Sequence, residues 1–183
     1  MKTTLAIALV AGLALSACNS GSEPAVTESP AATEAVQPET ASAELVDTAG
    51  KAVGTATITG TDGNLMVEVK VNDLPPGTHG AHIHTTGDCS AADFTSAGGH
   101  WNPANVNHGT ESDAPHPHAG DIGNIEVGED GTGTLSNTSN GTWAELFDAD
   151  GAAFVIHADA DDMKSQPSGN AGARIACGVF SKG

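Results

Sequence analysis

VGTATITG (residues 53–60) and NLMVEVKV (residues 64–71) are two runs rich in β-branched residues, separated by a short segment that contains Asp-Gly. In the second run apolar residues occupy every second position, which is typical of a strand with one buried face. An Asp-Gly pair between two such runs is a strong signal for a tight turn. The sequence therefore predicts an antiparallel hairpin with strands at residues 52–60 and 64–72.

Further short runs of strand type lie along the rest of the chain. They are AELVD (43–47), GAHIH (80–84), GNIEVGEDGTGTLSN (123–137, two runs around a second turn), TWAELF (142–147), AAFVIHA (152–158) and RIACGVF (174–180). About eight strands and no helix are expected, which predicts an all-β antiparallel barrel or sandwich. Residues 86–121 and 158–173 lack a strand pattern, and loops this long in a compact domain are usually functional.

The composition narrows the class of protein. The chain has 183 residues, 23 glycines, no tyrosine and 3% aromatic residues, which suits a small β-protein with long loops. Six Lys and Arg stand against 23 Asp and Glu, for a formal net charge of −17. Because phosphate binding needs clustered positive charge, nucleic acid is not an expected partner.

The N-terminus has the features of a secretion signal. LAIALVAGLALSA (residues 5–17) is an apolar run too short to remain as a membrane span, and it follows Lys2. The run ends at Cys18 in Leu-Ser-Ala-Cys, which resembles the lipobox of bacterial lipoproteins. Residues 1–17 are therefore expected to be a lipoprotein signal peptide and Cys18 the acylated residue; the alternative is a plain secretory signal.

Residues 19–42, NSGSEPAVTESPAATEAVQPETAS, link the cysteine to the first expected strand. The segment has no basic residue and too little apolar surface to form a core. Residues 18–42 are expected to be a disordered, lipid-anchored linker, and residues 43–183 the folded domain. The expected location is the periplasmic side of the bacterial cell envelope, at the outer rather than the inner membrane because Asn19 follows the cysteine.

The three cysteines are Cys18, Cys89 and Cys177. If Cys18 carries lipid, an even pair remains in an oxidising compartment, which favours a disulfide between Cys89 and Cys177. Such a bridge would stabilise the fold by on the order of 4–5 kcal/mol in the chain-entropy model. The alternative is two free thiols.

Histidines are concentrated in one part of the chain. They are His79, His82, His84, His100, His108, His116, His118 and His157. On a strand, residues i and i+2 share one face, so His82 and His84 can approach one ligand. A cluster this dense with Asp121 close behind favours metal binding over a solvated, histidine-rich loop. Such a loop would account for His116 and His118, but poorly for His157 at the end of an apolar strand.

Five motifs carry a resemblance to a known family. GAHIH (80–84), AGGHWNPANVNHG (97–109), HAGDIGN (118–124), FVIHADADD (154–162) and GNAGARIACGVF (169–180) resemble, in order and spacing, the copper–zinc superoxide dismutases. The resemblance runs through most of residues 43–183. It implies an eight-stranded flattened Greek-key β-barrel, related to the immunoglobulin-like sandwich, with two long functional loops.

The resemblance also implies two metal sites, with one copper and one zinc ion per chain. The implied copper ligands are His82, His84, His100 and His157; the implied zinc ligands are His100, His108, His118 and Asp121, so that His100 bridges the two metals. Four imidazoles suit Cu(II), and three imidazoles with one carboxylate suit tetrahedral Zn(II).

The same resemblance assigns further roles. Asp161 would accept hydrogen bonds from one copper-ligand and one zinc-ligand imidazole. Arg174 would bind and orient superoxide beside the copper, and His100 would take part in the proton chemistry. His79 matches a histidine that packs and hydrogen-bonds rather than ligating. His116 competes with His118 for one zinc position, and the motif register favours His118.

The function expected from the resemblance is dismutation of superoxide to oxygen and hydrogen peroxide, which would protect the cell envelope. The alternative is a non-enzymatic copper- and zinc-binding lipoprotein on the same fold, and a metal-dependent hydrolase is less favoured. Partners would be superoxide and the membrane through acylated Cys18, and a homodimer is left open. The ten residues between Cys89 and His100 resemble the bacterial branch of the family. Within that insert, Phe94 could cover the barrel or form an interface. Few basic residues near the site predict weak electrostatic steering of superoxide.

Overall fold

The structure is a computed structural model that describes residues 38–109 and 117–183. The expected signal peptide, the expected acylation site Cys18, most of the expected linker and His116 therefore lie outside the described residues. Within the part that is described, no helix is long and apolar enough to cross a membrane.

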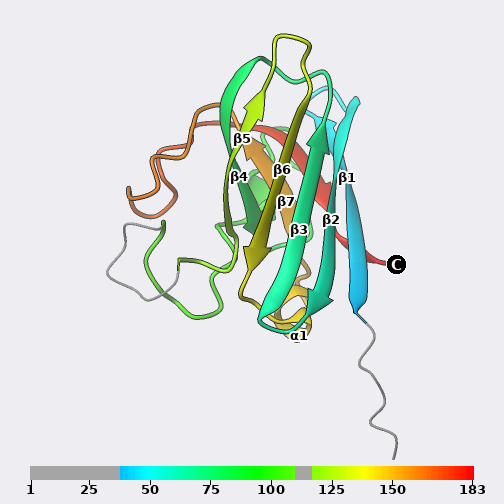
Figure 1. Cartoon of the computed structure of the whole chain (residues 1–183), viewed down its shortest axis with the longest axis vertical. Coiled ribbons are helices and arrows are strands. Elements are labelled where there is room, and N and C mark those ends of the chain that lie inside the picture. Colours follow the sequence, from blue (N-terminus) through cyan, green and yellow to red (C-terminus); the bar gives the residue numbers. More distant parts are fainter. Residues whose placement is uncertain (1–37, 110–116) are drawn as a thin grey trace, which may run out of the picture. The chain divides into compact units, whose positions relative to one another are not determined.

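Eight antiparallel strands close into a barrel, and a ninth short strand extends it (Figure 1). The strands are β1 (Glu39–Asp47), β2 (Ala52–Thr61), β3 (Asn64–Val71), β4 (Gly77–His84), β5 (Asp121–Val127), β6 (Gly133–Ser139), β7 (Ala153–His157), β8 (Arg174–Val179) and β9 (Ser181–Lys182). Their order around the barrel is β1-β2-β3-β6-β5-β4-β7-β8, with β8 returning to β1 and β9 paired to β1.

The barrel is flattened into two sheets because two of its strand pairings, β5 with β6 and β8 with β1, are short. β5 and β6 share one residue pair, Val127 with Gly133, and β8 shares two pairs with β1. The other ladders are longer; β2 and β3 pair over eight residues around the expected turn. The result is two sheets, β1-β2-β3-β6 and β4-β5-β7-β8, packed face to face. The expectation of an eight-stranded flattened Greek-key barrel is confirmed.

Two of the expected elements were wrong in detail. β1 begins at Glu39 rather than at residue 43, because residues 39–42 pair with residues 57–60 of β2. TWAELF is not a strand: residues Trp143–Leu146 form the short helix α1. Thr142 caps this helix, its side chain accepts from the Glu145 N–H, and the Glu145 side chain accepts from the Thr142 N–H. This reciprocal capping box outweighs the strand propensity of the aromatic residues.

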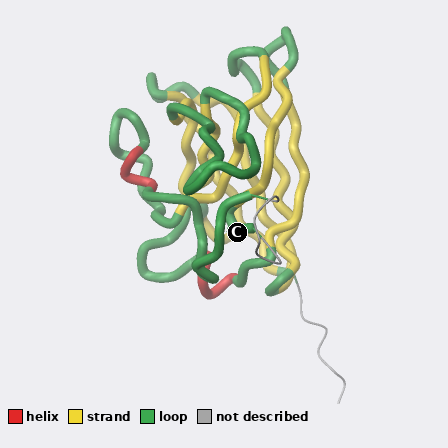
Figure 2. Tube along the Cα trace, turned by 90° about the vertical axis from the view of Figure 1, so that its left-hand side faces the viewer, coloured by secondary structure: helices red, strands yellow, loops and turns green. Residues whose placement is uncertain are grey.

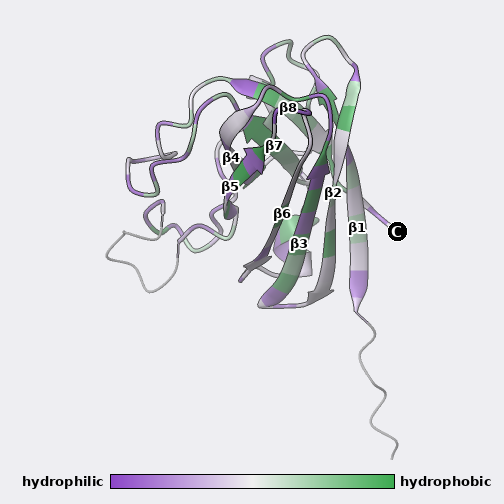
Figure 3. Ribbon diagram, turned by 45° about the horizontal axis from the view of Figure 1, so that its top comes forward, coloured by the Kyte–Doolittle hydropathy of each residue, from purple (hydrophilic) through white to green (hydrophobic). Residues whose placement is uncertain are grey.

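The main core fills the space between the sheets. Figure 3 shows hydrophilic and hydrophobic bands alternating along β3, as expected for a strand with one solvated face. Fully buried side chains of the core include Leu45, Ile58, Leu65 and Val67 from one sheet and Ile83, Ile125, Phe154 and Ile156 from the other. The hairpin quoted first thus supplies much of one inner face.

The long loops gather on one side of the strands (Figure 2). The first loop, which joins β4 to β5, contains η1 (Thr95–Ala97), the single 3-10 turn among the described residues. It is tied to β4, because the Trp101 N–H donates to the carbonyl of Ile83 and the Ile83 N–H donates to the carbonyl of Gly120. Gly120 lies so close to this strand that a Cβ there would meet the Ile83 carbonyl.

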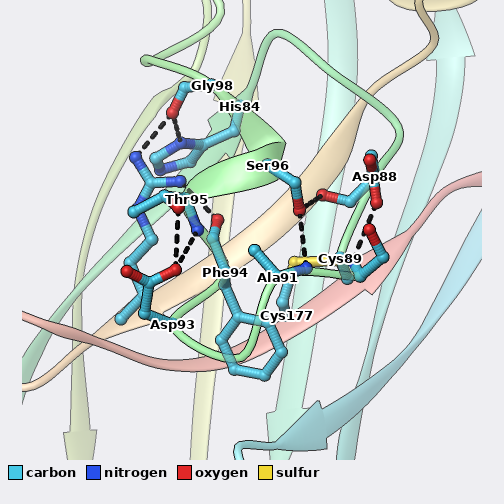
Figure 4. The surroundings of a disulfide bond; sticks show 12 residues. His84, Asp88, Cys89, Ala91, Asp93, Phe94, Thr95, Ser96, Gly98 and Cys177 are labelled. Carbon is cyan, nitrogen blue, oxygen red and sulfur yellow. Dashed lines mark hydrogen bonds between the residues drawn. A yellow bond between two sulfur atoms is a disulfide. The ribbon is translucent and has the colours of Figure 1, made fainter.

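A second, smaller core fastens the first loop to the outer face of β7 and β8. It consists of Phe94, Ala97, Ala153, Val155 and Cys177, with Cys89 packed against it. The expected disulfide between Cys89 and Cys177 is present within this core, with its Cα atoms 5.9 Å apart (Figure 4). Phe94 is 4% exposed, so of the two roles left open it covers the barrel.

Candidate metal centre

Two groups of side chains bring ligand atoms within 4.8 Å of one another. The first group is His82, His84, His100 and His157, and the second is His100, His108, His118 and Asp121. All eight positions, with His100 counted in both groups, are those that the sequence motifs predict. We call them the four-histidine group and the Asp121 group.

The four-histidine group is assembled on the outer face of the β4-β7 pair. In β4, Ala81 and Ile83 point into the core, so the alternation places His82 and His84 on the opposite face. His82 lies opposite Val155 of β7, and His157 ends that strand on the same face. His100 comes from the first loop and forms an isolated bridge with His84. Loops cover all four rings, which are buried.

Within this group the ring nitrogens converge. The Nε2 atoms of His84 and His157 lie 3.3 Å apart. His82 Nδ1 and His100 Nε2 are buried and have no hydrogen-bond partner. Buried polar atoms are nearly always satisfied, so orphaned nitrogens aimed at one point indicate a missing ligand. A set of four imidazole nitrogens fits copper.

The Asp121 group surrounds the first residue of β5. Asp121 Oδ1 lies 2.9 Å from His100 Nδ1 and 3.2 Å from His118 Nδ1, and Oδ2 lies 3.0 Å from His108 Nδ1. The Nδ1 atoms of His108 and His118 have no hydrogen-bond partner in an acceptable direction. Three imidazole nitrogens and one carboxylate, all converging, fit tetrahedral zinc with no open position.

The outward nitrogen of five of these rings donates to a protein oxygen. The pairs are His82 Nε2 with Asp161 Oδ2 (2.6 Å), His108 Nε2 with Asp161 Oδ1 (3.0 Å), His84 Nδ1 with the Gly98 carbonyl (3.0 Å), His118 Nε2 with the Val106 carbonyl (3.0 Å) and His157 Nδ1 with the Gly172 carbonyl (3.3 Å). Each donation fixes the tautomer and leaves the inward nitrogen as an acceptor. Asp161 thus joins the two groups, as the motif register predicts.

Burial sets the protonation state of the four-histidine group. Desolvation, with a smaller repulsion from His100, lowers the pKa of His84 to about 2. Desolvation and repulsion from His82 lower the pKa of His157 to about 3, and desolvation lowers the pKa of His100 to about 4 against its hydrogen bond to Asp121. These imidazoles are neutral at pH 7, which is the form that ligates a metal.

The Asp121 group behaves differently because it contains a carboxylate. Burial opposes its charge, but the hydrogen bond from His100 and the close contacts of His108 and His118 hold the pKa of Asp121 well below its usual range. Burial also lowers the pKa of His108, but its close contact with the Asp121 carboxylate and its hydrogen bond to Asp161 outweigh burial and raise that pKa to about 9. The ionised carboxylate of Asp121 therefore stabilises positive charge on the groups around it, as expected where a cation binds.

Arg174 lies beside the four-histidine group. It starts β8 and pairs with His157 across the ladder. Its Nη1 donates to the Phe94 carbonyl and its Nη2 to the Gly98 carbonyl, both at 2.6 Å. The Gly98 carbonyl also accepts from His84, so one loop oxygen holds both the guanidinium and a ring of the group (Figure 4). A half-buried, fixed guanidinium suits a small anion.

His79 does not belong to either group. Its Nδ1 lies 2.9 Å from the His157 carbonyl, and its Nε2 lies 2.9 Å from the Pro75 carbonyl. The expectation that it packs and hydrogen-bonds is confirmed.

The sequence patterns did not predict a role for three side-chain amides that support the site. Each accepts from the N–H and donates to the C=O of one loop residue: Asn102 with Val106, Asn124 with Asp161, and Gln166 with His108. Val106 and Asp161 in turn hold ligand rings. Asn102 and Asn124 lie inside recognised motifs, which was a usable signal, whereas a single glutamine in a polar loop offers none.

Comparison with known proteins gives a consistent result. The family model for copper/zinc superoxide dismutase (SODC) matches residues 52–180. The superoxide dismutase-like protein YojM of Bacillus subtilis is 43% identical over 145 residues, covering 75% of this chain and 74% of that protein. The Cu-Zn superoxide dismutase of Deinococcus radiodurans is 37% identical over 199 residues, covering 98% of this chain and 97% of that protein.

Comparison with solved structures points to the same family. A crystal structure of a SOD-like protein from Bacillus subtilis has a TM-score of 0.69 and 42% identity, covering 75% of this chain and 96% of that chain. The Cu/Zn superoxide dismutase from Brucella abortus has a TM-score of 0.62 and 28% identity, covering 77% and 99%. The fold is therefore shared with solved structures that are also related in sequence.

Proposed function

Because the chain belongs to the copper/zinc superoxide dismutase family, we propose that it converts two superoxide anions and two protons into oxygen and hydrogen peroxide. The observation that carries the proposal is the completeness of the site. Both ligand groups converge, their outward nitrogens are held, and Arg174 lies beside them.

Copper would be held by the four-histidine group and zinc by the Asp121 group, one ion of each per chain. Copper, when bound, supplies the one-electron redox couple, and zinc supplies a fixed positive charge without redox chemistry. The donor sets support this assignment, because only the second group contains a carboxylate. Metal analysis tests it: His84→Ala should lose copper and keep zinc, and His118→Ala should do the reverse. Loss of both metals in equal proportion from either variant would contradict the assignment.

The chain's own residues perform the remaining steps. The Arg174 guanidinium binds and orients each superoxide, since its planar donors are already fixed by two loop carbonyls. The His100 ring has Nδ1 against Asp121 and Nε2 toward the four-histidine group. It can hold a proton at Nε2 when that atom is not ligating and release it toward the forming peroxide.

A non-enzymatic metal-binding role on the same fold is the second candidate. The relative named superoxide dismutase-like makes the distinction necessary. Completeness of the ligand groups favours the enzyme. The test uses the full chain with Cys18→Ser, loaded with copper and zinc, in a direct assay of superoxide disappearance. Rapid, metal-dependent loss of superoxide is expected, and a fully loaded but inert protein would establish the second candidate instead.

The N-terminal residues support a further proposal: a lipoprotein on the periplasmic side of the envelope, anchored in the outer membrane by acylated Cys18. The apolar run before Leu-Ser-Ala-Cys supports it. Wild-type chain should incorporate labelled palmitate and sediment with outer membranes. Cys18→Ser should do neither; labelling of that variant would contradict the assignment.

A homodimer and weak steering of superoxide also remain proposals. Phe94 is packed within the chain, so a dimer would use another surface. Sedimentation velocity of the Cys18→Ser chain decides the oligomeric state.

The steering of superoxide is tested by ionic strength. Because electrostatic attraction is screened by salt, a steep fall of the catalytic rate with added salt would contradict weak steering.

A further inference from the structure

We infer that Gln166 is a positioning residue for the zinc side of the site: its amide holds the main chain of His108 and thereby fixes that ligand. The inference rests on the proposed zinc assignment of the Asp121 group. It concerns a residue of the second loop (158–173) whose side chain contacts no ligand atom of either group.

The contacts are specific and paired. The His108 N–H donates to Gln166 Oε1 at 2.8 Å, and Gln166 Nε2 donates back to the His108 carbonyl at 3.0 Å. Gln166 Nε2 also donates to the Lys164 carbonyl at 3.0 Å, which orients the amide. Both main-chain groups of one residue are thus bound by one side chain.

His108 needs this support more than the other ligands of its group. Asp121 begins a strand, His100 bridges to β4, and the His118 carbonyl accepts from the Asp121 N–H. His108 lies in a loop, and within the described residues its N–H and carbonyl are bonded by Gln166 alone. Because the residue is fully buried, both groups need a partner inside the protein.

The second loop holds His108 at two points. Asp161 accepts from its ring Nε2, which fixes the ring, and Gln166 binds the main chain, which fixes where the ring starts. The two loops also pack without spare room. A Cβ on Gly109 would lie 2.0 Å from the Met163 carbonyl, and one on Gly169 would lie 2.7 Å from His108 Nε2.

Removing the amide should therefore weaken zinc before it affects the barrel. Loss of a residue that orients a metal ligand typically lowers metal affinity by about 10- to 100-fold. We expect an effect of this size for Gln166→Leu. Gln166→Glu keeps an acceptor for the His108 N–H but loses the donor, so a smaller loss is expected.

A matched control exists in the same loop. The Asn170 amide binds Asp162 and Ser165, within the loop, and makes no bond to His108. Its φ of 53° is tolerated by glycine, so Asn170→Gly removes an ordering amide without backbone strain. This variant should keep near wild-type zinc affinity.

The test uses the full chain with Cys18→Ser, and its readouts do not depend on catalysis. They are zinc affinity by chelator competition, the visible spectrum of Co(II) bound in place of zinc, and amide exchange of the His108 N–H in metal-free protein. Gln166→Leu should weaken zinc, alter the Co(II) spectrum and speed exchange at His108, with circular dichroism of the barrel unchanged.

The results distinguish a failure of the Gln166 inference from a failure of the zinc assignment. If Gln166→Leu matches the wild type, or if Asn170→Gly loses zinc to the same extent, the inference is overturned while the proposed zinc site stands. If the wild type gives no tetrahedral Co(II) spectrum, the zinc assignment and the inference both fail. Should Gln166→Leu not fold, the intermediate zinc affinity expected of Gln166→Glu, or its absence, decides.

Discussion

The two sheets of the barrel are built differently, although they share one core. In β3 of the first sheet, buried and exposed residues alternate without exception. In the second sheet, the last six residues of β4 and all five of β7 are buried. The first sheet therefore has one buried face, and these strands of the second sheet have two.

The difference shows where the site is located. On β4 and β7 the inward side chains belong to the main core, and the outward ones are the ligands or the small core under Phe94. The loops that cover this outer face exclude water from the ligands. Substitutions in the first sheet should consequently change stability alone, and substitutions on the outer face of the second should change metal binding and activity.

The largest expected effect follows from removing the shared ligand. His100→Ala deletes a nitrogen from each ligand group, so activity of the loaded protein should fall by at least about 100-fold. Far-ultraviolet circular dichroism should stay that of a β-barrel, because His100 lies outside the main core. Retention of full activity would contradict the role of His100 in both groups.

Loss of the disulfide should affect both stability and the site. Replacing Cys89 and Cys177 by Ala should lower the free energy of unfolding by about 2–5 kcal/mol. Because the bridge fixes the loop whose Gly98 and Phe94 carbonyls hold Arg174, activity should also fall. Urea unfolding and activity are measured on the same samples; a drop in stability with unchanged activity would mean that the loop keeps its place without the bridge.

Neighbouring residues of β3 test the one-faced sheet. Leu65 is fully buried, and Leu65→Ala should lower the free energy of unfolding by about 2–5 kcal/mol. Met66 is 43% exposed, and Met66→Ala should change it by less than about 0.5 kcal/mol. Activity per folded molecule should be unchanged in both, and a loss of activity in either would break the proposed separation of the sheets.

Arg174→Ala should lower activity by roughly 10- to 100-fold, since a lost charge-assisted contact with the anion is worth about 1.5–3 kcal/mol. Copper and zinc contents should stay those of the wild type, because Arg174 is not in either ligand group. Arg174→Lys, which keeps the charge but not the planar donors, should lie between. Activity equal to the wild type in the Ala variant would remove Arg174 from the mechanism.

The last prediction concerns pH. In metal-free protein, the pKa values of His84, His157 and His100 are lowered to about 2, 3 and 4, so below pH 6.5 the unfolded chain binds more protons than the folded one. Because each of the three groups contributes about 1.4 kcal/mol per pH unit, the free energy of unfolding should fall by on the order of 4 kcal/mol per pH unit as pH decreases below about 6. The raised pKa of His108, about 9, gives stability that is lost as pH rises through 9. A flat profile of unfolding free energy between pH 4 and 9, measured with urea, would contradict these shifts.

Much of the site could be predicted because its ligands fall in short local motifs. The HxH pair follows from strand alternation, and the cysteine pair from counting. The helix at Trp143 was missed because strand propensity hid a capping box at Thr142. The role of Phe94 could not be predicted from the sequence, since the residues next to it do not indicate which surface it packs against. Gln166 was invisible for the same reason: its partner lies 58 residues away.

The central claim is that two metals share His100 on the covered face of the second sheet. Anomalous diffraction from crystals of the loaded Cys18→Ser chain, collected on both sides of the copper and zinc absorption edges, tests it most directly. The account predicts copper against His82, His84, His100 and His157, zinc against His108, His118 and Asp121, and His100 between the two ions. A single metal position, or zinc among the four histidines with the Asp121 group empty, would contradict it.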